Sequence, residues 1–152
     1  MTYEELLIRA DEENLIVKEK DIPGYGGRIY KNRVAIHKNI PTAAEKACIL
    51  AEELGHYHTT VGDILDQTRI ENKKQELKAR IWAYNNQIGL SGVLQAYKHH
   101  CQDLYEMAEY LEVTEEFLKE ALNHYRKKYG ECTAVDNYIV YFEPSLGVME
   151  LK

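Results

Sequence analysis

The chain has 152 residues, of which 45% are hydrophobic and 29% are charged, and its formal net charge is −6 at pH 7. These values are typical of a folded, soluble chain long enough for one domain over residues 1–152, and they exclude a disordered or fibrous protein. The acidic balance also argues against a surface that binds nucleic acid over its whole extent, so nucleic acid is not expected as a direct partner.

The first elements predicted along the chain are a helix and a β-hairpin. Leu6, Leu7 and Ala10 recur at helical spacing within residues 3–13, which predicts a short amphipathic helix. A turn-rich segment follows over residues 21–27. Two short runs that favour strands, residues 28–30 and 34–37, then flank a tight turn, and this pattern predicts a hairpin.

Two longer helices are predicted next. Thr42 is followed three residues later by Glu45, which is the spacing of a capping box, so a helix is expected from there to about Tyr57. A looser segment with Gly62 and Asp63 separates it from a second helix over about residues 71–88. The hairpin and these two helices form the predicted core, about residues 20–90.

The remaining elements are three shorter helical pieces and a second hairpin. The helical pieces are expected within residues 91–130, with Thr114 as the N-cap of the last one. Within them, residues 104–122 have the small residue, the valine turn and the capped second helix typical of a helix-turn-helix. Alternation over residues 133–142 and 146–151 predicts a C-terminal β-hairpin, at about residues 132–151. The predicted fold class is therefore α+β.

The first long helix carries a polar face opposite an apolar one. At 100° per residue, Glu52, Glu53 and His56 share one face of the helix. The opposite side gathers apolar residues that should pack in the core; these are Ala43, Ala47, Leu50 and Leu54. This separation predicts that the acidic and imidazole side chains line a site.

The residue types on that face indicate metal chemistry. Metallopeptidases use His-Glu-x-x-His on a helix, in which the two His bind zinc and the Glu is the general base. Here Glu52 stands first, Glu53 is the base and His56 is the second ligand. The next helix supplies Glu76, and the small Ala79 on the same side would let the two helices approach. The predicted site therefore has Glu52, His56 and Glu76 as ligands of Zn²⁺.

Three segments resemble the ImmA/IrrE family of phage and mobile-element metallopeptidases. They read RIYKNRVAIHKN from residue 28, ACILAEELGHY from residue 47 and QELKARIWA from residue 75, and the resemblance extends over most of residues 20–125. It implies a zincin-like core followed by helices that resemble a helix-turn-helix. It also implies ligand roles for His56 and Glu76 and a base role for Glu53; the usual motif of the family has His at the position of Glu52.

Three functions are compatible with these features. The first is a zinc-dependent endopeptidase that cleaves or antagonises a repressor-like protein, which is what members of the family do. The second is an inactive module that keeps the fold and binds a regulator protein. The third is a DNA-binding regulator, which Glu115 and Glu116 oppose because their charges would repel phosphates at the start of the presumed recognition helix.

Other side chains are expected to have structural roles. His58 would replace the missing imidazole only if the helix broke at Gly55, because in a continuous helix it points about 160° away from His56. Basic residues on the helices are expected to form solvated faces; these are Arg69, Lys73, Lys74, Lys78, Arg80 and Arg126 to Lys128.

The cysteines and the N-terminus predict a cytoplasmic protein. Cys48, Cys101 and Cys132 are an odd number without a C-x-x-C pair, so neither a disulfide framework nor a cysteine zinc site is indicated. Two glutamates stand near the N-terminus where a signal peptide would have basic residues, and no apolar run approaches the ~18 residues of a membrane span. No membrane partner is expected.

Overall fold

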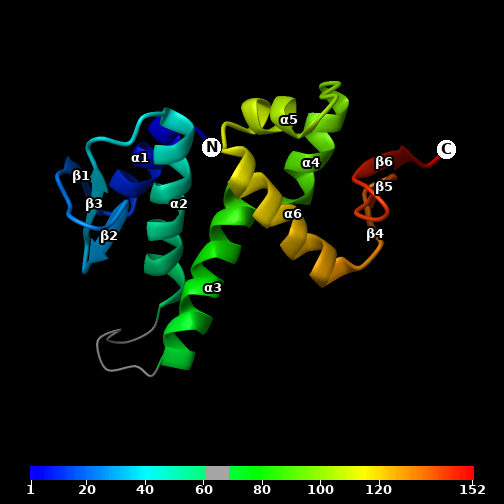
Figure 1. Ribbon diagram of the computed structural model, residues 1–152. Coiled ribbons are helices and arrows are strands. Elements are labelled where there is room, and N and C mark those ends of the chain that lie inside the picture. The colour runs from blue at the N-terminus through cyan, green and yellow to red at the C-terminus, as the bar shows by residue number, and fades with distance from the viewer. Residues whose placement is uncertain (61–68) are drawn as a thin grey trace. The chain divides into compact units, whose positions relative to one another are not determined.

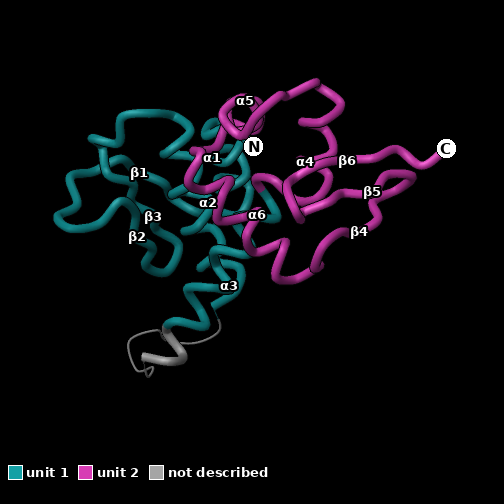
Figure 2. The backbone as a smooth tube through the Cα atoms, turned by 45° about the vertical axis from the view of Figure 1, so that its right-hand side comes forward, with its two compact units in different colours: residues 1–86 teal, residues 87–152 magenta. Residues whose placement is uncertain are grey.

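The structure, a computed structural model, describes residues 1–60 and 69–152, with the backbone alone for residues 69–72. Gly62 and Asp63 of the predicted looser segment lie outside the described residues. The chain divides into two compact units, residues 1–86 and 87–152 (Figure 2). Each unit is described by itself, and the single domain expected from the sequence stays a prediction.

Unit 1 combines a small sheet with the helices α1, α2 and α3 (Figure 1). In chain order its elements are α1 (Tyr3–Glu12), β1 (Ile16–Lys20), β2 (Gly27–Tyr30), β3 (Arg33–His37), α2 (Ala43–Thr59) and α3 (Arg69–Gln87). The helix starts follow from capping. The hydroxyl of Thr42 accepts a hydrogen bond from the Glu45 N–H at 3.1 Å, which confirms the predicted start of α2. A complete capping box, which was not predicted, forms between Thr2 and Glu5 at the start of α1.

The sheet of unit 1 has three strands in the order β1-β3-β2. The antiparallel pair of β2 and β3 confirms the predicted hairpin, with Ile29 opposite Val34. Strand β1 was not predicted, and it pairs in parallel with β3, so that Val17 lies opposite Val34. Its sequence, Ile-Val-Lys-Glu-Lys, has too few apolar residues for a clear period-two signal.

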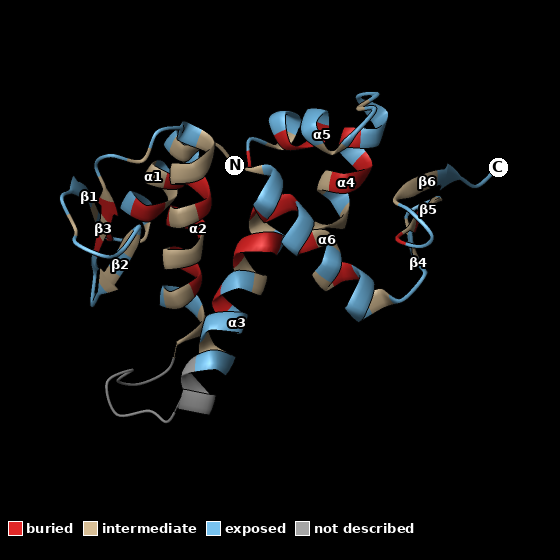
Figure 3. Ribbon diagram, viewed as in Figure 1, coloured by how far each residue is buried: buried red, intermediate tan, exposed pale blue. Residues whose placement is uncertain are grey.

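The core of unit 1 lies between the sheet and the helices that cover one of its faces (Figure 1). Leu6 of α1, Ile36 of β3 and Leu50 of α2 are fully buried. Ala47, Leu50 and Leu54 confirm the predicted apolar face of α2, whereas Ala43 is exposed because it is the first residue of the helix, one turn before the buried stripe begins. Figure 3 shows buried and exposed positions along α2. The buried face of α2 fixes which of its residues are left for a site.

Unit 2 contains three helices followed by an antiparallel sheet. Its elements are α4 (Gly89–Lys98), α5 (Leu104–Leu111), α6 (Glu115–Tyr129), β4 (Cys132–Val135), β5 (Tyr138–Tyr141) and β6 (Gly147–Glu150). The three predicted helical pieces are confirmed, and the hydroxyl of Thr114 caps α6 by accepting from the Phe117 N–H at 3.1 Å. Between α5 and α6, Glu112 adopts a left-handed conformation and Val113 is buried, as in a helix-turn-helix.

The predicted C-terminal hairpin was wrong in its strand count. The expected strand over residues 133–142 is two strands, because Asp136 has a positive φ of 53° and begins a turn with Asn137. Asp and Asn tolerate this conformation better than most residues do. The result is a three-stranded antiparallel sheet in the order β4-β5-β6.

None of the helices in the described part of the chain is both long and apolar enough to cross a membrane.

Candidate functional site

The polar face of α2 is the starting point of the site. Glu52, Glu53 and His56 are all partly buried, while Leu50 and Leu54 on the other side of the helix are completely buried. The helix continues through Thr59, so the three polar residues keep the spacing that the helical projection predicted. The face therefore holds two carboxyl groups and one imidazole that are partly buried. Charges at partly buried positions interact more strongly than charges at an open surface.

A contact between α2 and α3 brings a fourth side chain to this face. A Cβ atom on Gly55 would collide with the carbonyl oxygen of Ala79, so only glycine fits at this point of α2. Ala79 and Ala83 are completely buried. These findings confirm that small residues let the two helices approach closely, and the approach places Glu76, one turn before Ala79, beside α2.

His56 and Glu76 meet across the two helices. The distance between His56 Nε2 and Glu76 Oε1 is 3.3 Å, with the His56 side chain 14% exposed and the Glu76 side chain 57% exposed. Two ligands of one tetrahedral zinc ion lie about 3.4 Å apart when their bonds are about 2.1 Å long. The pair therefore has the donor types and the separation that a shared Zn²⁺ requires.

His56 has a second ring nitrogen, Nδ1, which is not the one in contact with Glu76. His56 Nδ1 is buried and makes no hydrogen bond with any described residue. A buried polar atom without a partner is costly, and such atoms often mark a site where a group is to be bound. The nitrogen that faces Glu76 is Nε2, so Nδ1 is not part of the pair; in a zinc site this second nitrogen would donate the hydrogen bond that orients the ring.

The side chains on this face do not form a complete set of metal ligands as they lie. Within the described part of the chain, no group of three or more His, Cys, Asp or Glu side chains is arranged to hold a metal ion. Glu52 acts on the site through its charge. Together with burial, which is the main cause, and with Glu76, it raises the pKa of Glu53 to about 8. A ligand role for Glu52 stays a prediction.

Glu53 lies beneath the edge strand β2. A Cβ atom on Gly27 would come within 3.1 Å of Glu53 Cγ and 3.2 Å of Glu53 Oε1, and still closer to Ile49. The backbone of β2 therefore passes directly along the α2 face that carries Glu53. Gly27 was predicted only as part of a turn; a glycine next to a strand was the available signal for such a close approach.

His58 belongs to a different cluster. Its Nε2 lies 2.8 Å from Glu13 Oε2, and its ring stacks on Trp82 at 4.9 Å between centroids. The guanidinium group of Arg9 lies over the Trp82 ring, with its central carbon 4.8 Å from the ring centroid. Because α2 does not break at Gly55, the condition under which His58 would replace the missing imidazole is not met. The cluster joins α1, α2 and α3.

Two further side chains of α2 and α3 lie in the core. Tyr84 and Cys48 are buried. Tyr57 is exposed. Glu115 and Glu116 are exposed in the first turn of α6, where their charges oppose binding of a phosphate backbone to this helix.

Comparison with known proteins identifies one family. The family model described as Peptidase_M78, IrrE N-terminal-like domain, matches residues 8–123, which are about three quarters of the chain. The match contains the α2 and α3 residues of the site. No curated protein and no solved structure matches the chain.

Proposed function

The chain belongs to the IrrE N-terminal-like domain family of peptidases, and on this premise we propose that it is a zinc-dependent endopeptidase that acts on a repressor-like regulator protein. The observation that carries the proposal is the 3.3 Å separation of His56 Nε2 and Glu76 Oε1, beside the carboxyl group of Glu53. Imidazole and carboxylate are common zinc ligands in peptidases, and a glutamate next to them supplies the base.

In this proposal His56 and Glu76 hold Zn²⁺, with Glu52 as a third ligand. The bound ion would polarise the scissile carbonyl and acidify the attacking water. A carboxylate in place of the usual first histidine adds negative charge, which lowers the Lewis acidity of the ion but strengthens its binding electrostatically.

Glu53 would move the protons of the reaction. At a pKa of about 8 its carboxyl group is largely protonated at neutral pH, and a cation held by His56 and Glu76 would lower that pKa and favour the carboxylate. The carboxylate would then take a proton from the attacking water and pass it to the leaving amine.

The edge strand β2 offers a place for the substrate. It is the end strand of the sheet, and its residue Gly27 lies against Glu53. An extended peptide that adds to the outer edge of β2 by main-chain hydrogen bonds would pass next to Glu53. This supports an unfolded or extended segment of a protein as the substrate.

A direct test incubates the zinc-loaded protein with candidate regulator proteins and with unstructured peptides. Cleavage products are then detected by mass spectrometry. Wild-type protein should cleave at least one of them, and Glu53→Gln should lower the rate by about 100-fold or more. Full activity of Glu53→Gln would reject the proposed role of Glu53.

The second candidate is a module that binds the regulator protein without cleaving it. The position of Glu52 favours it, since a carboxylate stands where the metallopeptidase motif has its first histidine. For such a module, binding of the regulator should be the same in wild-type protein, in Glu53→Gln and in the presence of a chelator.

A further inference from the structure

The sheet of unit 1 has a second face, which points away from α1 and α2. Alternation along the strands separates the two faces. Val34 and Ile36 of β3 are buried beneath the helices, and Glu19 of β1 pairs with Lys46 of α2 at 2.6 Å. The intervening residues form what we call the outer face; they are Ile16, Lys18 and Lys20 of β1, Arg28 and Tyr30 of β2, and Arg33 and Ala35 of β3.

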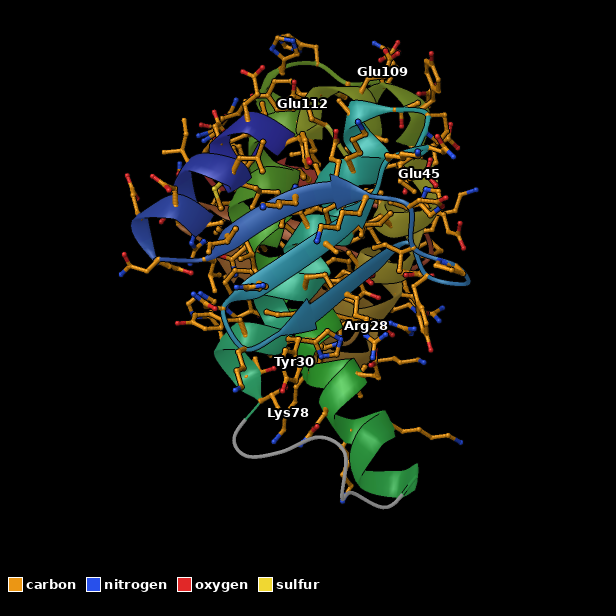
Figure 4. The ribbon with its side chains drawn as sticks, turned by 90° about the vertical axis from the view of Figure 1, so that its left-hand side faces the viewer. Arg28, Tyr30, Glu45, Lys78, Glu109 and Glu112 are labelled. Atoms are coloured by element: carbon orange, nitrogen blue, oxygen red, sulfur yellow. The ribbon has the colours of Figure 1, made fainter. Side chains whose placement is uncertain are left out.

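The register of the strands arranges these residues in rows across the sheet. Lys18 and Arg28 both lie opposite Ala35, so two cations flank a small residue. In the next row, Ile16 and Tyr30 lie on either side of Arg33. The small central side chain leaves a hollow of about 260 Å³, lined by outer-face residues together with Ile22 and Val34. Figure 4 views this face, with Arg28 and Tyr30 labelled on β2.

The outer face is positively charged although the chain as a whole is acidic. Its cations are Lys18, Lys20, Arg28 and Arg33, and all four are exposed. None of them makes an ion pair with a carboxylate in the described part of the chain, and no acidic residue lines the hollow. Asp21, at the end of β1, is directed to His37 at 3.5 Å. The outer face is therefore a local patch of uncompensated positive charge on a chain whose net charge is −6.

Aromatic rings stand among these cations. Tyr30 is 66% exposed and Tyr25, in the loop before β2, is 58% exposed. Lys31 Nζ lies 5.5 Å from the Tyr30 centroid, and the Arg28 guanidinium carbon lies 5.7 Å from the Tyr25 centroid. Exposed rings beside cations are the combination with which proteins stack the bases and neutralise the phosphates of a single strand.

We infer that the outer face of the unit 1 sheet binds single-stranded nucleic acid. Cations two residues apart on a strand are about 6.6 Å apart, so they can follow the phosphates of an extended single strand. The rings of Tyr30 and Tyr25 favour a single strand over a duplex, because bases are accessible for stacking only when they are unpaired. They also favour it over an acidic peptide, since carboxylates offer no planar ring to stack on.

The test is fluorescence anisotropy with a labelled oligothymidylate of about 15 nucleotides. The full-length protein should bind it, and binding should weaken roughly 50-fold between about 50 and about 200 mM salt if four phosphates are neutralised. Lys18→Glu combined with Arg28→Glu should weaken binding at least about tenfold at low salt. Tyr30→Ala should weaken it about tenfold through loss of stacking.

Matched controls make the result specific to this face. Lys73→Glu combined with Lys74→Glu makes the same charge change on the exposed side of α3, and Tyr105→Ala removes a similarly exposed ring from unit 2. Both should bind like wild type, and thermal melting should confirm that all variants are folded. Absent binding, equal loss in the α3 control, equal affinity for a duplex of the same length, or equally tight binding of a polyglutamate peptide would each overturn the inference.

Discussion

Gly55 of α2 faces the carbonyl oxygen of Ala79 in α3 so closely that no side chain fits between them. The contact is backbone against backbone, so a larger residue cannot be accommodated by a rotamer change. It determines how near the two helices come, and with that the separation of His56 and Glu76, which stand next to the contact on their helices. A glycine in the middle of a helix is otherwise unfavourable by about 0.5–1 kcal/mol relative to alanine.

Gly55→Ala should therefore destabilise the protein although it improves helix propensity. Overpacking of this kind costs about 1–3 kcal/mol, which exceeds the propensity gain. Urea denaturation would measure the change in the free energy of unfolding. As a control, Gly147→Ala adds the same methyl group where nothing lies within 4 Å, and it should have little effect. A neutral or stabilising Gly55→Ala would contradict the close helix approach.

Glu53→Gln should stabilise the metal-free protein, and more so as the pH rises. The pKa of Glu53 is raised from 4.5 to about 8 in the folded state, so between these pH values the unfolded chain releases a proton that the folded chain keeps. Stability present below pH 4.5 is then lost as the pH rises toward 8. The carboxamide of glutamine does not ionise in this pH range, so the variant does not lose this stability as the pH rises.

The difference between Glu53→Gln and wild type should thus grow from pH 5 to pH 8, reaching about 1–2 kcal/mol, a value reduced for the partial exposure of the side chain. Chemical denaturation in the presence of a chelator at several pH values would show it. Glu12→Gln, the same change at an exposed position of α1, should give no such trend. A constant difference for Glu53→Gln would argue against the buried, protonated carboxyl group.

His58→Ala should lower stability by about 1 kcal/mol without changing the metal content. The imidazole stacks on Trp82 and pairs with Glu13, so its loss weakens the cluster that joins the three helices of unit 1. His99→Ala removes a similarly stacked imidazole, from Tyr110 in unit 2, and should also leave the metal content unchanged. A loss of bound zinc in His58→Ala alone would assign His58 to the site.

Much of this fold follows from local signals in the sequence. Thr42 and Thr114 mark helix starts that the structure reproduces, and the apolar stripe through Leu50 and Leu54 predicts which face of α2 is buried. These signals act within one or two helical turns, so they can be read without tertiary context. The three helical pieces after Ser91 are confirmed for the same reason.

The features of the first sheet that were not predicted depend on pairing between distant segments, whereas the Thr2–Glu5 capping box and the turn at Asp136 are local features that were overlooked. Strand β1 carries Lys18, Glu19 and Lys20, so its sequence lacks the apolar alternation that predicts a strand. The strand is stabilised by parallel pairing with β3. The turn at Asp136 interrupts an alternation that looks continuous in the sequence. The cationic outer face depends on this sheet, so it could not be found before β1 and the register were known. The close approach of Gly27 to Glu53 depends on how α2 packs against β2, for which the glycine was the one signal in the sequence.

The zinc content of protein purified without chelator, determined by inductively coupled plasma mass spectrometry, decides whether His56 and Glu76 form a metal site. If His56 and Glu76 share a zinc ion, wild-type protein should contain about one zinc per chain, and His56→Ala and Glu76→Gln should each lose most of it. The exposed control Glu12→Gln should retain it. Zinc-free wild-type protein that also fails to bind added zinc, or full zinc content in both site variants, would contradict the proposed metal site.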